Sequence, residues 1–193
     1  MSTALEENYL ESVKKQFRYY QKLGEQAMAQ LMPEQLFTTF NPDSNAIAVI
    51  VKHLHGNMLS RWTDFLTSDG EKPWRNRDQE FEVTATSKEE VLQQWQTGWE
   101  CLLNALENLN PADLMRIIYI RNEGHTVMEA INRQLAHYSY HVGQIVYAAK
   151  LLKQTEWTSL SIPRNKSAAY NQNKFSQEKR RSHFTDSEQK GLV

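Results

Sequence analysis

Four long segments of the chain carry apolar residues at alternating spacings of three and four, and no other feature limits the possible folds as strongly. The expected helices cover about residues 5–31, 46–66, 87–109 and 127–153. The last two follow capping-box sequences, which are typical of helix starts. Each helix has one apolar stripe and an otherwise polar surface, so the stripes must be buried against one another. We therefore expect an all-α fold built from four packed helices.

Two connections between these helices are not simple turns. Residues 67–86 form a polar linker that is longer than a helix connection requires. It has two interpretations: an ordered edge packed by its aromatic residues, or a segment at the mouth of a site, where Arg75 and Arg77 contact an anionic substrate and Trp74 anchors the loop. Residues 114–121 are β-prone and too few for another long helix, which predicts a short extended segment before the last helix.

Composition limits the class of protein. A chain of 193 residues with 23% charged and 40% hydrophobic residues is typical of a globular protein. We expect residues 1–165 to form the helical domain and residues 166–193 to form a polar, basic tail that is partly disordered. The net charge of −1 disfavours nucleic acid as a partner, and no apolar run is long enough to span a membrane. Cys101 is the single cysteine, and no secretion signal is visible, so a cytoplasmic location is expected.

Two histidines in the last helix stand four residues apart. At this spacing, His137 and His141 leave the same face of the helix at the edge of its apolar stripe. Such a pair can occur by chance, but with a third ligand from another helix it can hold a metal ion. The second helix offers His53 and His55, which diverge by about 160° on a helix. Periodicity alone does not choose between them.

The surrounding residue types exclude two familiar helical metal sites. A zincin needs Glu after the first histidine, whereas Tyr138 follows His137. A ferritin-like di-iron site needs two Glu-x-x-His motifs, and the sequence has none. One divalent ion with imidazole ligands remains, which favours Zn²⁺ or Ni²⁺ and a role in activating a bound water or thiol. Cys101 lacks a catalytic motif and is interpreted as a buried filler.

The histidine motifs carry a resemblance to a known family. His53-Leu54 in the second helix, together with His137-x-x-x-His141 and Val142-Gly143-Gln144-Ile145 in the fourth, resembles the DinB-like superfamily. An uncharacterised bacterial subfamily is the closer resemblance, on Lys52-His53-Leu54, Gly56-Asn57-Met58, Ser60-Arg61-Trp62, Asp69-Gly70-Glu71-Lys72-Pro73-Trp74-Arg75-Asn76-Arg77-Asp78 and Leu160-Ser161-Ile162-Pro163-Arg164. The resemblance spans about residues 5–165.

The resemblance implies a four-helix bundle of up-down-down-up type, often dimeric, with a three-histidine metal site. It also implies that His53, and not His55, is the third ligand. Members of the superfamily include S-transferases that use the low-molecular-weight thiol bacillithiol and a mycothiol-dependent isomerase.

These observations lead to one leading expectation and two alternatives. We expect a metal-dependent thiol S-transferase or hydrolase, a homodimer, in which a divalent ion on His53, His137 and His141 activates a thiol or water. Trp74, Arg75 and Arg77 are the expected substrate contacts. The first alternative is a non-catalytic bundle, structural or stress-related, whose ion stabilises the fold or the dimer. The second, nucleic-acid binding by the basic tail, is disfavoured.

Overall fold

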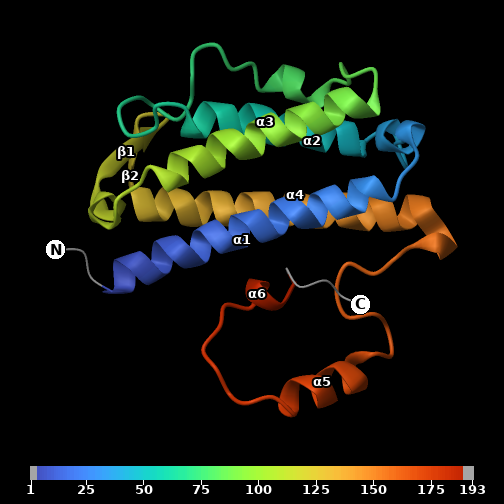
Figure 1. Ribbon diagram of the computed structural model, residues 1–193. Coiled ribbons are helices and arrows are strands. Elements are labelled where there is room, and N and C mark those ends of the chain that lie inside the picture. The colour runs from blue at the N-terminus through green and yellow to red at the C-terminus, as the bar shows by residue number, and fades with distance from the viewer. Residues whose placement is uncertain (1–3, 189–193) are drawn as a thin grey trace.

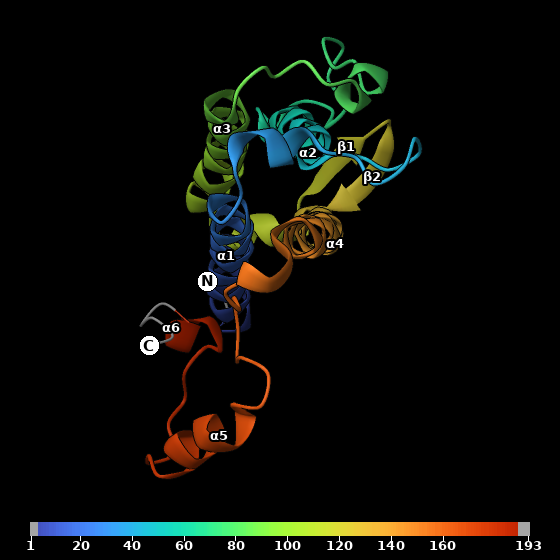
Figure 2. The same ribbon diagram turned by 90° about the vertical axis from the view of Figure 1, so that its right-hand side faces the viewer.

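The computed structural model describes residues 4–188 and is mainly helical (Figure 1). Its four long helices are α1 (Ala4–Ala29), α2 (Ile47–Trp62), α3 (Lys88–Glu107) and α4 (Val127–Lys153). Helices α1 and α4 run in one direction, and α2 and α3 run in the opposite direction (Figure 1). Seen along their axes, the four helices occupy the corners of a square (Figure 2). The four helices predicted from periodicity are confirmed, although α2 ends at Trp62 rather than near Leu66.

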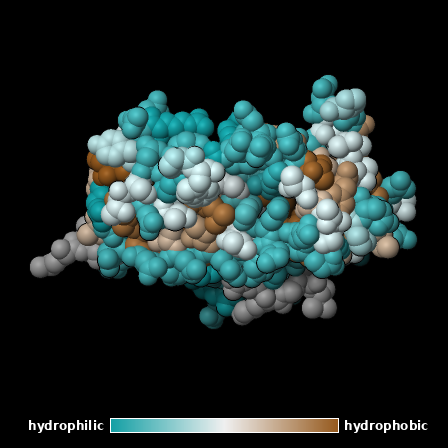
Figure 3. All heavy atoms as spheres, turned by 90° about the horizontal axis from the view of Figure 1, so that it is seen from above, coloured by the Kyte–Doolittle hydropathy of each residue, from teal (hydrophilic) through white to brown (hydrophobic). Residues whose placement is uncertain are grey.

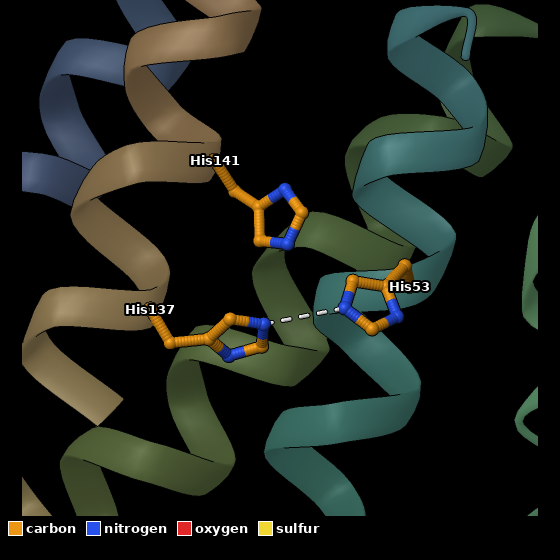
Figure 4. A group of neighbouring side chains, drawn as sticks. All are labelled: His53, His137 and His141. Carbon is orange, nitrogen blue, oxygen red and sulfur yellow. Dashed lines mark hydrogen bonds between the residues drawn. The ribbon is translucent and has the colours of Figure 1, made fainter. Parts of the chain in front are cut away.

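A buried aromatic cluster fixes how α4 is rotated against its neighbours. Phe17 of α1, Trp99 of α3 and Tyr138 of α4 are fully buried, with ring centroids 5.9 to 6.4 Å apart. The Tyr138 hydroxyl donates to the side-chain oxygen of Asn57 at 2.9 Å and accepts from the indole N–H of Trp62 at 3.1 Å. A buried hydroxyl needs such partners. These bonds hold Tyr138 against α2. His137 and His141, which precede and follow Tyr138 in sequence, also point towards α2 (Figure 4).

The linker between α2 and α3 carries the chain back along the length of the helices, because α2 and α3 run in the same direction (Figure 1). Its first part is tied down by Ser60 of α2, whose hydroxyl donates to the carbonyl of Gly70 and accepts from the backbone N–H of Lys72. Its later part contains the 3₁₀ helix η2 (Asp78–Phe81), which packs on α2. The linker is therefore an ordered segment that lies against α2.

A β-hairpin precedes α4. After the 3₁₀ helix η3 (Pro111–Met115), strands β1 (Ile117–Ile120) and β2 (Glu123–Thr126) pair antiparallel. The predicted extended segment is thus one strand of a hairpin. Arg121 and Asn122 form its turn with φ angles of 56° and 62°, and the Asp69 carboxylate of the linker accepts both of their backbone N–H groups at 2.9 and 2.8 Å. The turn is therefore fixed to the start of the linker.

The rest of the described chain is short elements and the tail. The 3₁₀ helices η1 (Pro33–Phe37) and η4 (Gln154–Glu156) lie in connections, and the tail contains α5 (Ser167–Phe175) and α6 (Thr185–Glu188). At α6 the chain returns to α1, and Asp186 of α6 forms an ion pair with Lys15 of α1 at 3.0 Å. The last part of the expected tail, residues 189–193, lies outside the described residues.

The surface hydropathy and the helix composition bear on whether the chain could cross a membrane. Viewed from above the linker side, it is mainly hydrophilic, with small hydrophobic patches (Figure 3). Among residues 4–188, every helix is too short or too polar to cross a membrane.

Candidate metal centre

Three imidazoles from two helices face one another between α2 and α4 (Figure 4). His137 and His141 lie one turn apart on α4, and His53 reaches them from α2. One nitrogen from each ring lies within 4.8 Å of the other two. His55 is not part of this group and borders a separate surface hollow with Gln94 and Thr97 of α3. The structure therefore brings together the three predicted ligands and separates them from His55.

Each of the three rings is held at its Nδ1 atom by a side-chain oxygen. His53 Nδ1 lies 2.9 Å from Glu80 Oε2, and His141 Nδ1 lies 2.8 Å from Gln144 Oε1. His137 Nδ1 lies 3.3 Å from Gln134 Oε1. Amide and carboxylate oxygens accept hydrogen bonds, so each Nδ1 is the protonated nitrogen. In the neutral rings, this tautomer leaves the lone pair on Nε2, which is the arrangement that a metal-binding histidine needs.

The three Nε2 atoms lack good partners of their own. His53 Nε2 and His137 Nε2 are 3.3 Å apart (Figure 4), and in the tautomer that carries the proton on Nδ1, neither Nε2 can donate a hydrogen bond to the other. His141 Nε2 is buried and has no hydrogen-bond partner within the described chain. Two imidazole nitrogens on a tetrahedral zinc ion lie about 3.3 Å apart. The donor set therefore fits a divalent cation, which turns three unsatisfied lone pairs into ligands.

The neutral state of the α4 histidines has a physical cause. Burial, together with smaller effects of His141, His53, Arg61 and Arg75, lowers the pKa of His137 to about 3. Burial also lowers the pKa of His141 to about 4, against the effect of its hydrogen bond with Gln144. Both rings are therefore neutral at physiological pH and do not need to lose a proton before they bind a metal ion.

Acid is expected to destabilise the metal-free protein through these two rings. Their ordinary pKa is 6.5, so below pH 6.5 the unfolded chain binds protons that the folded chain does not. The free energy of unfolding should be greatest above pH 6.5 and fall as the pH drops towards 4. Urea denaturation of chelator-treated protein at about pH 7 and pH 5 measures this difference. The double variant His137→Gln/His141→Gln should show a smaller difference, and an unchanged one would contradict the assignment.

Glu80 of the linker is the site residue that sequence reasoning missed. It is buried, and besides His53 it binds Arg75, whose Nε and Nη2 donate to the two carboxylate oxygens at 2.7 and 2.9 Å. Burial alone raises the pKa of Glu80, but the hydrogen bonds from His53 and Arg75 outweigh it and hold the pKa below its ordinary value. Glu80 is therefore an ionised carboxylate that orients a metal-binding ring.

A glycine makes room for this carboxylate. A β-carbon at Gly56 of α2 would collide with the side chain of Glu80. Gly56 lies three residues after His53, about one turn along α2. The Glu80 carboxylate can therefore lie directly on the helix surface beside the His53 ring. The Gly56 position in the sequence thus has a packing reason that depends on the linker.

A cavity of about 350 Å³ opens beside the three histidines. It is lined by residues from α2, the linker, the hairpin turn and α4: His53, Asn57, Arg61, Arg75, Arg77, Phe81, Arg121, Arg133, Gln134, His137, Tyr140 and His141. Phe81 stacks on His53 with centroids 5.1 Å apart, and Tyr140 lies against His141 at 4.1 Å. An ion on the three histidines therefore borders a cavity large enough for a small ligand.

The three linker residues predicted to contact substrate lie in different surroundings. Trp74 is 58% exposed and does not line the cavity. Arg75 lines it, but only 2% of its side chain is exposed and it is bound to Glu80 and to Glu71. Arg77 lines the cavity with its guanidinium 5.2 Å from the centroid of Phe81. Their role in substrate binding stays a prediction, and Arg77 is the one of the three whose position suits it best.

Comparison with known proteins places the chain in a family and gives no activity. Neither the curated proteins nor the solved structures contain a match to the chain. A family model described as "Protein of unknown function (DUF1572)" matches residues 4–166, which include all three histidines and Glu80. The chain, with its three-histidine centre between α2 and α4, belongs to the DUF1572 family.

Proposed function

We propose that the protein is a metal-dependent enzyme with a DinB-like fold, in which a divalent ion on His53, His137 and His141 activates a thiol or a water molecule. The four long helices, with α1 and α4 opposite in direction to α2 and α3, support the likeness to the DinB-like bundle. Three neutral imidazoles leave the ion its full charge, which acidifies a bound thiol or water. They also favour Zn²⁺ or Ni²⁺ as the ion.

The observation that carries this proposal is the number of ligands together with the cavity beside them. A structural zinc site is usually closed by four protein ligands, whereas a catalytic site has three and an open position. Among residues 4–188, the candidate group contains three ligands, and all three line the cavity. Glu80 is close but its oxygens bind His53 Nδ1 and Arg75. A substrate in the cavity would therefore lie next to the three histidines that would hold the ion.

The nucleophile in this proposal comes from the substrate or solvent and not from the protein. Cys101 lies near Thr63 and the carbonyl of Met58, away from the cavity. Burial raises the pKa of its thiol above the ordinary value, against a weaker opposing effect of Thr63. A thiol with a raised pKa is a poor source of thiolate at neutral pH. A low-molecular-weight thiol or water, bound to the ion, fits the site better.

A second candidate function is a non-catalytic protein whose ion stabilises the fold. Within the part of the chain that the structure describes, the cavity lining includes no carboxylate and no cysteine, so these residues offer no carboxylate or thiolate as a separate general base. In this case the ion only ties α2 to α4.

Cobalt substitution separates the two candidates. Co²⁺-loaded protein should change its visible spectrum when 2-mercaptoethanol is added, because thiolate coordinates the open position. The metal-to-protein ratio, measured by elemental analysis, should stay near one during the titration. A spectrum that does not respond to thiol or to a change of pH, with the metal retained, would favour the structural role.

A further inference from the structure

The cavity at the metal centre is strongly positive. Five arginines line it, from four different parts of the fold: Arg61, Arg75, Arg77, Arg121 and Arg133. Among residues 4–188, no carboxylate lines it, and Glu71 and Glu80 are the carboxylates that pair with these arginines. The excess of guanidinium over carboxylate is therefore three charges, before the charge of any ion is counted. Such a cavity attracts anions.

Two of the five arginines are already committed to the protein. Arg61 and Arg75 are buried, with side chains 6% and 2% exposed, and both bind Glu71. Arg75 also binds Glu80 through two nitrogens. These two guanidiniums hold Glu71 and Glu80 in place. Breaking such a buried ion pair would strongly destabilise the fold. Arg75 therefore has little capacity left for a ligand. The Nε of Arg61 has no hydrogen-bond partner within residues 4–188, but only 6% of this side chain is exposed, so a ligand has less access to it than to the other three arginines.

The other three arginines have unused hydrogen-bond donors. Among the described residues, the guanidinium of Arg77 has no carboxylate partner and lies over the ring of Phe81. Within residues 4–188, the guanidinium of Arg133 has one hydrogen-bond contact, between its Nη1 and His125 Nε2 at 3.5 Å. Arg121 is 55% exposed at its side chain and reaches Glu71 through Nε alone, at 3.3 Å. A guanidinium has five N–H donors, so all three can bind a ligand in addition to these contacts.

The backbone holds these three arginines around one opening. Arg133 lies four residues before His137 on α4, and at this spacing the two side chains share a face of the helix. Arg121 lies in the hairpin turn, whose backbone N–H groups are bound by Asp69. Arg77 precedes η2, whose Phe81 stacks on His53. The three guanidiniums thus come from α4, the hairpin and the linker. Helix α4 carries two of the metal ligands, the linker contacts His53, and the hairpin turn is bound to the linker.

We propose that Arg77, Arg121 and Arg133 form an anion subsite, which binds a carboxylate or phosphate group of the substrate while its reacting atom meets the ion. The planar fork of guanidinium suits both groups, since it donates two parallel hydrogen bonds to them. This inference rests on the proposed function and names its substrate class: a small anionic molecule. The contacts of Arg75 with Glu71 and Glu80 also assign this side chain to the protein scaffold and not to the substrate.

A pair of thiols that differ in charge tests the subsite. Co²⁺-loaded protein is titrated with mercaptosuccinate, which has two carboxylates, and with neutral 2-mercaptoethanol. We expect mercaptosuccinate to bind at least about ten-fold more tightly, as charge-assisted hydrogen bonds suggest. The variant Arg77→Gln/Arg133→Gln should lose this preference and keep its affinity for 2-mercaptoethanol. The matched control, Lys174→Gln/Arg180→Gln, removes two positive charges from the tail and should keep the preference.

A second measurement separates this inference from the proposed function. Succinate and inorganic phosphate carry no thiol, and calorimetry measures their binding to the same metal-loaded protein and variants. Binding of either anion by the parent protein, and at least ten-fold weaker binding by Arg77→Gln/Arg133→Gln, supports the subsite even when no thiol reaches the ion. Equal binding of the charged and neutral thiols by the parent protein, or equal anion binding by parent and variant, overturns it.

Discussion

Replacing His137 by Ala is expected to abolish stoichiometric binding of divalent metal and to leave the helices folded. The ring supplies one of three converging nitrogens, and its Nε2 atom lies 3.3 Å from that of His53. Loss of a partner that only orients a ligand weakens metal binding by about 10–100-fold. Loss of the ligand itself should exceed that range. The ring lies beside the buried core of α4, whose packing residue is Tyr138, so the helix content should change little.

Metal content by elemental analysis and helix content by circular dichroism test this prediction together. The parent protein should also gain thermal stability when Zn²⁺ or Ni²⁺ is added, because a ligand that binds only the folded state stabilises it. His137→Ala should lose that gain, and His53→Ala and His141→Ala should behave alike. His55→Ala is the matched control, because His55 lies on α2 but outside the group. Full metal retention by His137→Ala, or metal loss by His55→Ala, would remove this site.

Replacing Glu80 by Ala is expected to cause the largest loss of stability among the single changes considered, and to weaken metal binding as well. The change leaves Arg75 buried with only Glu71, at 3.3 Å, as a counter-charge. Breaking a buried ion pair costs about 3–5 kcal/mol. His53 also loses the acceptor for its Nδ1–H, so metal affinity should fall by about 10–100-fold. Chemical denaturation and metal titration measure the two effects.

Two further variants show whether Glu80 acts through charge or through shape. Glu80→Gln keeps an oxygen that can accept from His53, so it should bind metal more tightly than Glu80→Ala while remaining less stable than the parent protein. Glu82→Ala is the control, since Glu82 is an exposed neighbour on the same linker. If Glu80→Ala proves as stable as Glu82→Ala and binds metal normally, the carboxylate has no role in positioning His53.

The long helices could be predicted because their signal is local. Alternating spacings of three and four mark the stripes that become the core, and Ser87 and Thr126 cap α3 and α4 as predicted. The reciprocal bond of the capping box forms at Thr126, whereas at α3 the Glu90 carboxylate accepts from Thr86. The pair His137 and His141 was visible for the same reason, since one helix sets its geometry. His53 was distinguished from His55 only by resemblance, because the two lie on opposite shoulders of the α2 stripe.

The parts that were missed depend on contacts between distant segments. Strand β2 reads Glu-Gly-His-Thr, which has no alternation of apolar and polar residues, and it forms by pairing with β1. Glu80 looks like one acid in a charged linker, and its role depends on its contact with His53, 27 residues earlier. Arg75 lines the cavity as its place in the linker suggested, but its contacts with Glu71 and Glu80 could not be read from local sequence.

The distance along the chain between the ligands has a consequence for folding. His53 and His137 are 84 residues apart in sequence, and the chain has a single cysteine, so it cannot form an internal disulfide. An ion bound to both rings closes a loop of that length, as a disulfide would. In the chain-entropy model, a permanent cross-link across such a loop lowers the conformational entropy of the unfolded chain, which stabilises the folded state by about 4.5 kcal/mol at 25 °C. The ion can therefore act as a reversible cross-link. Its formation depends on the concentration of available metal, whereas formation of a disulfide depends on oxidation.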